Sequence, residues 1–264
     1  MASSGVGALL RGWRGLRGCT QLDLALDAGV SARHLSFVET GRARPSAEMV
    51  LKLAERLEVP LRERNRMLLA AGYAPAFPEL AIDEPPMAAV REALDVILEG
   101  HEPNPAVAVD RHWNLVAANA TMAALAAGVD EALLEPPVNV MRLGLHPGGL
   151  MASVVNQAET RRYFVGRLER QVAISGDPVL AALLEEVGGY PVASAGDGDA
   201  GGGVGNILTP VLRMRLPGGE EASFFFSVAS FGTAIEVTAS ELSIELGFPA
   251  DRATVEALRK LPRR

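Results

Sequence analysis

Residues 20–46 read TQLDLALDAGVSARHLSFVETGRARPS. A threonine and then a serine stand where they can cap two helices, over residues 21–28 and 31–40, and both segments carry apolar residues at helical spacing. Between them Gly29 makes a tight turn, and Gly41 ends the second segment. The stretch therefore predicts two short helices joined by a sharp turn.

Three more short helices surround this pair in the sequence. Leucines and a tryptophan recur at helical spacing over residues 9–17, and similar apolar stripes follow over residues 47–57 and 61–71. A glycine or a serine stands at the ends of these segments, where it can end or cap a helix. Five short helices with brief turns predict a compact all-α domain, which we place at residues 1–73.

Two helices at this spacing are typical of a helix-turn-helix, whose second helix enters the major groove of DNA. The residues just after its cap reach base edges, where Arg33 suits guanine O6 and N7 and His34 can donate or accept. Phe37, one turn later, either contacts a thymine methyl group or packs within the domain. The predicted DNA-contacting residues are Gln21, Ser31, Ala32, Arg33, His34, Phe37, Arg42 and Arg44.

Contacts to DNA phosphates are predicted from Gln21, at the start of the first helix, and from Arg42 and Arg44 in the following loop. Gln21 also suits a helix terminus, as Ser31 does, and Arg44 also suits a solvated position. The charge distribution favours phosphate contact, because residues 1–75 hold 11 Lys and Arg against 7 Asp and Glu, whereas the whole chain has a net charge of −7. A basic first part joined to an acidic remainder suits a protein that meets DNA with its first part.

The remaining sequence predicts a second domain of a different class. Four prolines mark a linker that, with a connecting helix, occupies residues 74–103. Beyond it, at residues 104–264, we predict an α+β domain with an antiparallel sheet. Its predicted strands are 106–109, 113–117, 208–216, 222–231 and Ala234–Thr238, and its predicted helices are 119–127, 149–171, 177–187 and 251–260.

A glycine-rich stretch at residues 188–205 contains a G-x-G-x-x-G pattern at Gly196, Gly198 and Gly201. A dinucleotide-binding loop needs a strand before this pattern and a helix directly after it. The sequence predicts neither, so we interpret the stretch as a surface loop.

The first domain resembles the repressor-like helix-turn-helix regulators of the XRE type. The residues that carry the resemblance are Gln21, Leu24-Ala25, Gly29-Val30-Ser31, Leu35-Ser36, Val38-Glu39, Gly41-Arg42, Pro45-Ser46, Leu53-Ala54 and Leu57. In that family an arginine of the first helix pairs with the acidic residue before the glycine. The resemblance therefore implies a structural pair between Arg14 and Glu39.

The second domain resembles the MmyB-like regulators. The resemblance is carried by AVAVDRHWNLVAANATMAAL (106–125), PPVNVMRLGLHPGGL (136–150), NQAETRRYFVGRLERQVAISGDPVLAALLEEVGGYP (156–191) and SFFFSVASFGTAIEVTASELSIELGFPAD (223–251). It implies a PAS-like ligand-binding domain behind the DNA-binding domain, with a pocket between sheet and helices that can hold a fatty acid.

Candidate ligand contacts follow from residue chemistry. Residues 222–231 are apolar on both faces of the predicted strand, so Phe224 and Phe226 either line a cavity or form plain core. A ligand carboxylate would need a cationic or amide partner. The candidates for this partner are Asn139, Arg142, His146 and Arg162. We favour Arg142, for which an ion pair to a nearby helix is an equal alternative.

The sequence offers no positive sign of catalysis, so we expect no enzyme. The single cysteine, Cys19, and the four histidines show no metal-ligand spacing, and neither a G-x-S-x-G motif nor a P-loop is present. We therefore expect no metal and no cofactor other than a possible bound fatty acid or similar apolar ligand. No apolar run is long enough for membrane insertion, and no secretory signal precedes the first helix, so we expect a cytoplasmic, nucleoid-associated protein.

We therefore predict a DNA-binding transcription regulator that senses a small apolar, fatty-acid-like ligand through its second domain. Its expected partners are a double-stranded DNA operator, the small-molecule ligand and a second copy in a homodimer. Two alternatives stay open. The second domain could serve only for dimerisation, which predicts a solid core without a cavity, or it could carry an unrecognised enzymatic activity.

Overall fold

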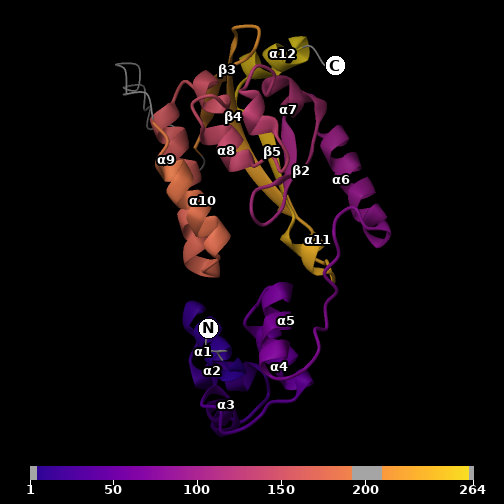
Figure 1. Ribbon diagram of the computed structural model, residues 1–264, viewed down its shortest axis with the longest axis vertical. Coiled ribbons are helices and arrows are strands. Elements are labelled where there is room, and N and C mark those ends of the chain that lie inside the picture. Colours follow the sequence, from indigo (N-terminus) through magenta and orange to yellow (C-terminus); the bar gives the residue numbers. More distant parts are fainter. Residues whose placement is uncertain (1–4, 192–209, 262–264) are drawn as a thin grey trace. The chain divides into compact units, whose positions relative to one another are not determined.

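The structure, a computed structural model, describes residues 5–191 and 210–261, which form two compact units (Figure 1). The first unit comprises the described residues up to Glu84 together with Gly232–Ser240. The second comprises the described residues of Pro85–Phe231 and those from Glu241 onward. The segment predicted as linker and connecting helix is thus divided between the two units.

The first unit contains the predicted helices of the helix-turn-helix domain. They are α1 (Val6–Leu16), α2 (Gln21–Asp27), α3 (Ala32–Glu39), α4 (Ala47–Arg56) and α5 (Leu61–Ala70). Thr20, Ser31 and Ser46 cap α2, α3 and α4, because each side-chain oxygen accepts a hydrogen bond from the backbone N–H three residues later, at 3.1 or 3.2 Å. Local sequence therefore decides where these helices begin.

Each helix contributes a large apolar side chain to the core of the first unit. The buried side chains include Leu10, Leu24, Leu35, Leu53 and Met67. Gly7 lets α1 pack directly on α3, since a Cβ atom there would lie 2.3 Å from the carbonyl oxygen of Val38. Gly29 takes a left-handed conformation, with φ of +61°, in the turn between α2 and α3. These contacts fix the orientation of α3.

A segment from far along the chain completes the first unit. The backbone N–H of Val237 donates to the carbonyl oxygen of Pro78 at 2.9 Å, and the hydroxyl of Thr238 donates to that of Leu80 at 2.7 Å. In return, the backbone N–H of Leu80 donates to the Glu236 carboxylate at 2.9 Å. These three bonds form what we call the Glu236 clamp.

The predicted strand at Ala234–Thr238 is wrong. The carboxylate of Glu236 accepts hydrogen bonds from the backbone N–H groups two and three residues later, at 3.0 and 2.7 Å. These bonds start a helical turn, and the chain forms the short helix α11 (Val237–Glu241). The strand that the sequence analysis missed lies just beyond, at β5 (Ser243–Pro249).

The second unit contains helices and an antiparallel sheet, as predicted. Its strands are β1 (Ala106–Val109), β2 (Leu115–Ala118), β3 (Leu212–Arg215), β4 (Glu221–Ser230) and β5. The sheet order is β2-β1-β5-β4-β3, and every neighbouring pair is antiparallel. The predicted hairpin is confirmed, because β3 pairs with β4 and Leu212 lies opposite Phe224. The missed strand β5 occupies the centre of the sheet.

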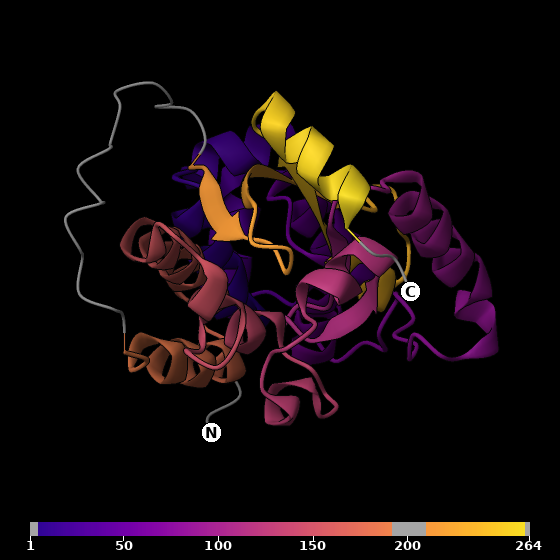
Figure 2. The same ribbon diagram turned by 90° about the horizontal axis from the view of Figure 1, so that it is seen from above.

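Helices cover this sheet. The α-helices are α6 (Ala88–Gly100), α7 (Ala120–Leu125), α8 (Val140–Leu145), α9 (Gln157–Ser175), α10 (Pro178–Gly188) and α12 (Arg252–Lys260). The short 3₁₀ turns are η1 (Pro85–Met87), η2 (Glu131–Leu134) and η3 (Leu150–Ser153). Helix α6 contacts β1 and β2, whereas α12 contacts β4 and β5 (Figure 2).

The described parts of the chain contain no helix that is both long and apolar enough to cross a bilayer. The glycine pattern at Gly196, Gly198 and Gly201 lies outside the described residues. Its predicted loop therefore stays a prediction.

Candidate functional site

The outward face of α3 presents the side chains predicted to read bases. Leu35 and Val38 point into the core, whereas Arg33 is exposed and His34 and Phe37 are half-buried. The Arg33 guanidinium lies 5.5 Å from the centre of the Phe37 ring, one turn along the helix. Arg33 and Phe37 therefore form one surface on this helix.

Behind that face, a buried carboxylate fixes α3 to α1. Glu39 accepts hydrogen bonds from the Nε and Nη2 of Arg14 at 2.8 and 3.1 Å, so the structure contains the pair that the family resemblance implied. A third bond comes from the Gln21 amide at 2.8 Å. Three donors from two helices thus hold the last residue of α3.

The electrostatics of Glu39 follow from these contacts. Burial is the largest single influence and raises the pKa of the Glu39 carboxyl. The hydrogen bonds from Arg14 and Gln21, with the charges of Arg14 and Arg11, together outweigh burial and hold this pKa below its ordinary value. Glu39 is therefore ionised at neutral pH, and its role is to position α3.

Two residues predicted to contact phosphates have internal roles as well. The amide of Gln21 is directed to Glu39, and the Arg44 Nε donates to the carbonyl oxygen of Ala71 at 3.1 Å. The guanidinium of Arg44 also lies 5.3 Å from the centre of the Tyr73 ring. Ser31 caps α3, while Ala32 is half-buried and Arg42 is exposed. The DNA contacts of these residues stay predictions.

In the second unit, an apolar cavity of about 100 Å³ lies between the sheet and its helices. Strands β1, β3, β4 and β5 and helices α7, α8 and α9 all contribute side chains to its wall. Phe224 and Phe226 of β4 line it and also belong to the hydrophobic core, and Thr160 and Glu245 supply its polar side chains. The wall of this cavity is therefore almost entirely apolar.

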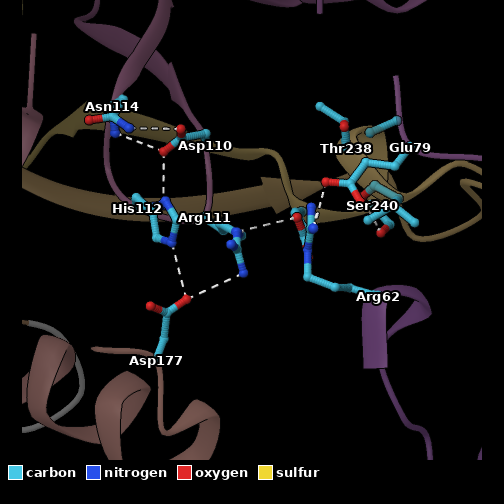
Figure 3. A network of polar contacts seen from close by, with 12 residues as sticks. Arg62, Glu79, Asp110, Arg111, His112, Asn114, Asp177, Thr238 and Ser240 are labelled. Atoms are coloured by element: carbon cyan, nitrogen blue, oxygen red, sulfur yellow. Dashed lines mark hydrogen bonds and ion pairs between the residues drawn. The ribbon is translucent and has the colours of Figure 1, made fainter. Parts of the chain in front are cut away.

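A strained turn places Trp113 in the wall of this cavity. Trp113 has a φ of +68°, which is rare for a bulky residue. One Asp110 oxygen holds the turn, because it accepts hydrogen bonds from the backbone N–H groups of His112 and Asn114, both at 2.8 Å (Figure 3). His112 Nε2 lies 3.0 Å from a carboxylate oxygen of Asp177, the N-cap of α10.

Glu245 is the charged side chain in the cavity wall. Both of its oxygens accept hydrogen bonds from Arg167 of α9, at 2.7 and 2.8 Å, and its side chain is 6% exposed. Arg167 lies 4.6 Å from the centre of the Trp113 ring, whose indole N–H donates to Gln171 at 2.8 Å. Sequence reasoning missed Glu245 and Arg167, and the available signal was one charge within the apolar run 244–248.

The four predicted partners of a ligand carboxylate lie outside the cavity wall. The Asn139 side chain caps α8, where it accepts a hydrogen bond from the backbone N–H of Arg142 at 3.2 Å. The ring of His146 packs edge-on against Tyr190, with centroids 4.9 Å apart, and Arg162 is exposed on α9. The structure therefore does not bring these four residues together with Phe224.

Arg142 forms an ion pair with Glu186 of α10, which is the alternative that the sequence left open. Its Nε and Nη2 lie 2.8 and 2.7 Å from the Glu186 carboxylate. This hydrogen bonding holds the pKa of Glu186 below its ordinary value. Burial, aided by a hydrogen bond to Glu186, raises the pKa of Tyr190 to about 12. These residues join α8 to α10, and none of them is among the residues that line the cavity.

Residues 90–261 match the family described as the MmyB-like transcription regulator ligand binding domain. The chain belongs to the MmyB-like transcription regulator family. Residues 10–64 of this MmyB-like regulator match a helix-turn-helix family, so both predicted resemblances are confirmed. The MmyB-like regulator is thus a DNA-binding transcription regulator with a ligand-binding-type domain.

Among solved structures, the MmyB-like regulator is similar to the clp gene regulator ClgR from Corynebacterium glutamicum, with 28% sequence identity. The similarity covers 39% of this chain and 96% of that chain, with a TM-score of 0.23. No curated protein matches the chain.

Proposed function

We propose that this MmyB-like regulator binds a specific DNA operator and that a small, apolar, acyl-chain-like ligand changes its operator affinity. The observation that carries the proposal is the cavity of about 100 Å³ in the second unit, with its apolar wall. A second domain that served only for dimerisation would be expected to have a solid core, so the cavity favours a sensor. The PAS-like character that we expect of this domain is supported by its five-stranded antiparallel sheet.

The size of the cavity limits the proposed ligand. An apolar cavity of about 150 Å³ is large enough to bind benzene. The cavity of about 100 Å³ therefore suits a short or branched apolar group, and a long acyl chain would require the wall to move.

DNA binding is proposed to use a homodimer on an operator with two half-sites about 34 Å apart. Arg33 and Phe37 would face the bases, because their side chains share the outer face of α3. A ligand that binds one conformation of the dimer more tightly than another shifts the population and so changes operator affinity.

The Glu236 clamp supplies a physical route for this coupling. Phe224 and Phe226 of β4 line the cavity, and the chain that follows β4 enters the first unit at Gly232–Ser240. There the clamp ties it to Pro78 and Leu80, which lie between α5 and the second unit along the chain. We propose that a ligand that moves β4 also moves this segment.

A cavity-filling variant tests the ligand proposal. Gly144 of α8 lines the cavity, and a Cβ atom added there meets nothing within 4 Å. Gly144→Leu should therefore fill the cavity while its helix keeps a good helix former. We expect native mass spectrometry of the full-length protein to show a co-purified small molecule, and we expect Gly144→Leu to lose it.

The matched control is Gly166→Leu on α9, where an added Cβ would meet only the end of Arg170 at 3.7 Å. This control should retain the bound molecule. Repeated purification of the unaltered protein without any bound molecule, together with no binding of added apolar compounds, would contradict the sensor proposal and favour a dimerisation domain.

A further inference from the structure

The polar groups that face the cavity are neutral or acidic. Thr160 and Glu245 are the polar side chains in its wall. A small adjoining hollow shares Phe164 and Phe226 with the cavity and adds Glu159 and Tyr163. The described residues that line these two hollows include no lysine, arginine or histidine.

Arg167, the cation that hydrogen-bonds to Glu245 in the cavity wall, already has partners within the second unit. Arg167 gives two hydrogen bonds to Glu245, at 2.7 and 2.8 Å, and stacks on Trp113. A ligand carboxylate that took Arg167 would leave the carboxylate of Glu245, which is 6% exposed, without its cation. Such an exchange is strongly unfavourable, because a buried charge needs a partner of opposite sign.

Glu245 nevertheless has capacity for one more partner. An ionised carboxylate offers about four acceptor positions on its two oxygens, and Arg167 occupies two of them. A ligand hydroxyl or amide N–H could donate to a remaining position. A ligand carboxylate offers no donor when ionised, and its charge is repelled by that of Glu245.

We propose that the cavity selects an uncharged amphiphile, such as an alcohol or an amide, whose hydrogen-bond donor meets Glu245, over a carboxylate with the same chain. This inference rests on the proposed function, in which the cavity holds an apolar ligand. The inference specifies which ligand headgroup is compatible with the charges around the cavity.

Two probes of matched chain length test the headgroup. Isothermal titration of the full-length protein with 1-butanol and with sodium butanoate at pH 7.5 should show at least tenfold tighter binding of the alcohol. Equal or tighter binding of butanoate would overturn the headgroup proposal and leave the apolar cavity intact as a binding site. Failure of both probes to bind would instead count against the proposed function itself. The comparison uses the unaltered protein, so it does not depend on whether a variant folds.

A substitution at Glu245 tests whether this residue causes the preference for an uncharged headgroup. Glu245→Gln removes the repelling charge and frees Arg167, so butanoate should gain affinity relative to 1-butanol by tenfold or more. The control is Glu169→Gln, an exposed position on the same helix as Arg167, which should leave the ratio unchanged. An unchanged ratio in a folded Glu245→Gln variant would show that Glu245 does not select the headgroup.

Discussion

Each unit of this regulator buries one glutamate against an arginine, and the two pairs differ in what surrounds them. Glu39 in the first unit accepts hydrogen bonds from Arg14 at 2.8 and 3.1 Å. Glu245 in the second unit accepts hydrogen bonds from Arg167 at 2.7 and 2.8 Å. Both carboxylates are almost completely buried, with exposed fractions of 0% and 6%.

The two glutamates differ in their surroundings beyond the arginine. Glu39 accepts another hydrogen bond from Gln21, so its hydrogen bonds from α1 and α2 serve the fold. Glu245 lies in the wall of a cavity of about 100 Å³ and accepts its hydrogen bonds from Arg167. The comparison teaches that two buried ion pairs of similar geometry can differ in role, because Glu245 lies in the wall of the apolar cavity and Glu39 holds two helices together.

The largest effect that we predict is the loss of folding stability when Arg14 or Arg167 is replaced by alanine. Arg14→Ala leaves the fully buried Glu39 without its main cation and should lower the free energy of unfolding of the first unit by about 3–5 kcal/mol. Arg167→Ala should cost at least as much, because it removes both hydrogen bonds that Glu245 accepts from Arg167, whereas Glu39 keeps its bond from Gln21. Denaturant unfolding monitored by circular dichroism measures both.

Arg11→Ala is the control for the first variant, because the Arg11 side chain is 55% exposed and its ion pair to Glu39 is 3.6 Å long. This change should cost no more than about 1 kcal/mol. A clearly smaller loss for Arg167→Ala than for Arg14→Ala would contradict the dependence of Glu245 on Arg167.

A smaller effect separates positioning from reading within the first unit. Arg33→Ala removes an exposed side chain of α3, so it should weaken binding to a selected operator by roughly 1–3 kcal/mol and leave unfolding unchanged. Fluorescence anisotropy with a duplex obtained by selection from random DNA measures this loss. Unchanged operator affinity would remove Arg33 from the reading surface.

A substitution in the Glu236 clamp should have a smaller effect, which is on the response of operator affinity to the ligand. Glu236→Ala removes the carboxylate that accepts from the backbone N–H of Leu80. We expect a severalfold smaller response of operator affinity to saturating 1-butanol, with ligand affinity retained, because the route through the clamp is weakened. Glu220→Ala, an exposed position in the turn after β3, is the control. A full response in Glu236→Ala would show that coupling takes another route.

The smallest effect that we predict is on folding stability at acidic pH. The pKa of Glu39 is held below its ordinary value of about 4.3, so its ionised form stabilises the folded state. This contribution is complete above the ordinary pKa and is lost as the pH falls through the lowered one. Unfolding midpoints measured from pH 7 to 3 should therefore fall in acid, and Glu39→Gln should flatten that fall. An equally steep fall in the variant would assign the acid sensitivity to other groups.

Local signals made the first unit predictable. Thr20, Ser31 and Ser46 cap helices by contacts to residues three positions away, and apolar residues recur at helical spacing. The sheet was harder to predict, because β5 carries Glu245 within an apolar strand. That charge is tolerated only because Arg167, 78 residues earlier, reaches it.

The residues of the candidate site were likewise only partly predictable from the sequence. The sequence by itself determined the helix-turn-helix, the outward position of Arg33 on α3 and the apolar character of Phe224 and Phe226, because these depend on periodicity and residue type. Only the tertiary structure decided that Arg142 pairs with Glu186 and that Glu245 faces the cavity. The reason is physical, since the role of a charge depends on which partner reaches it and on whether the space beside it is filled, and long-range packing sets both.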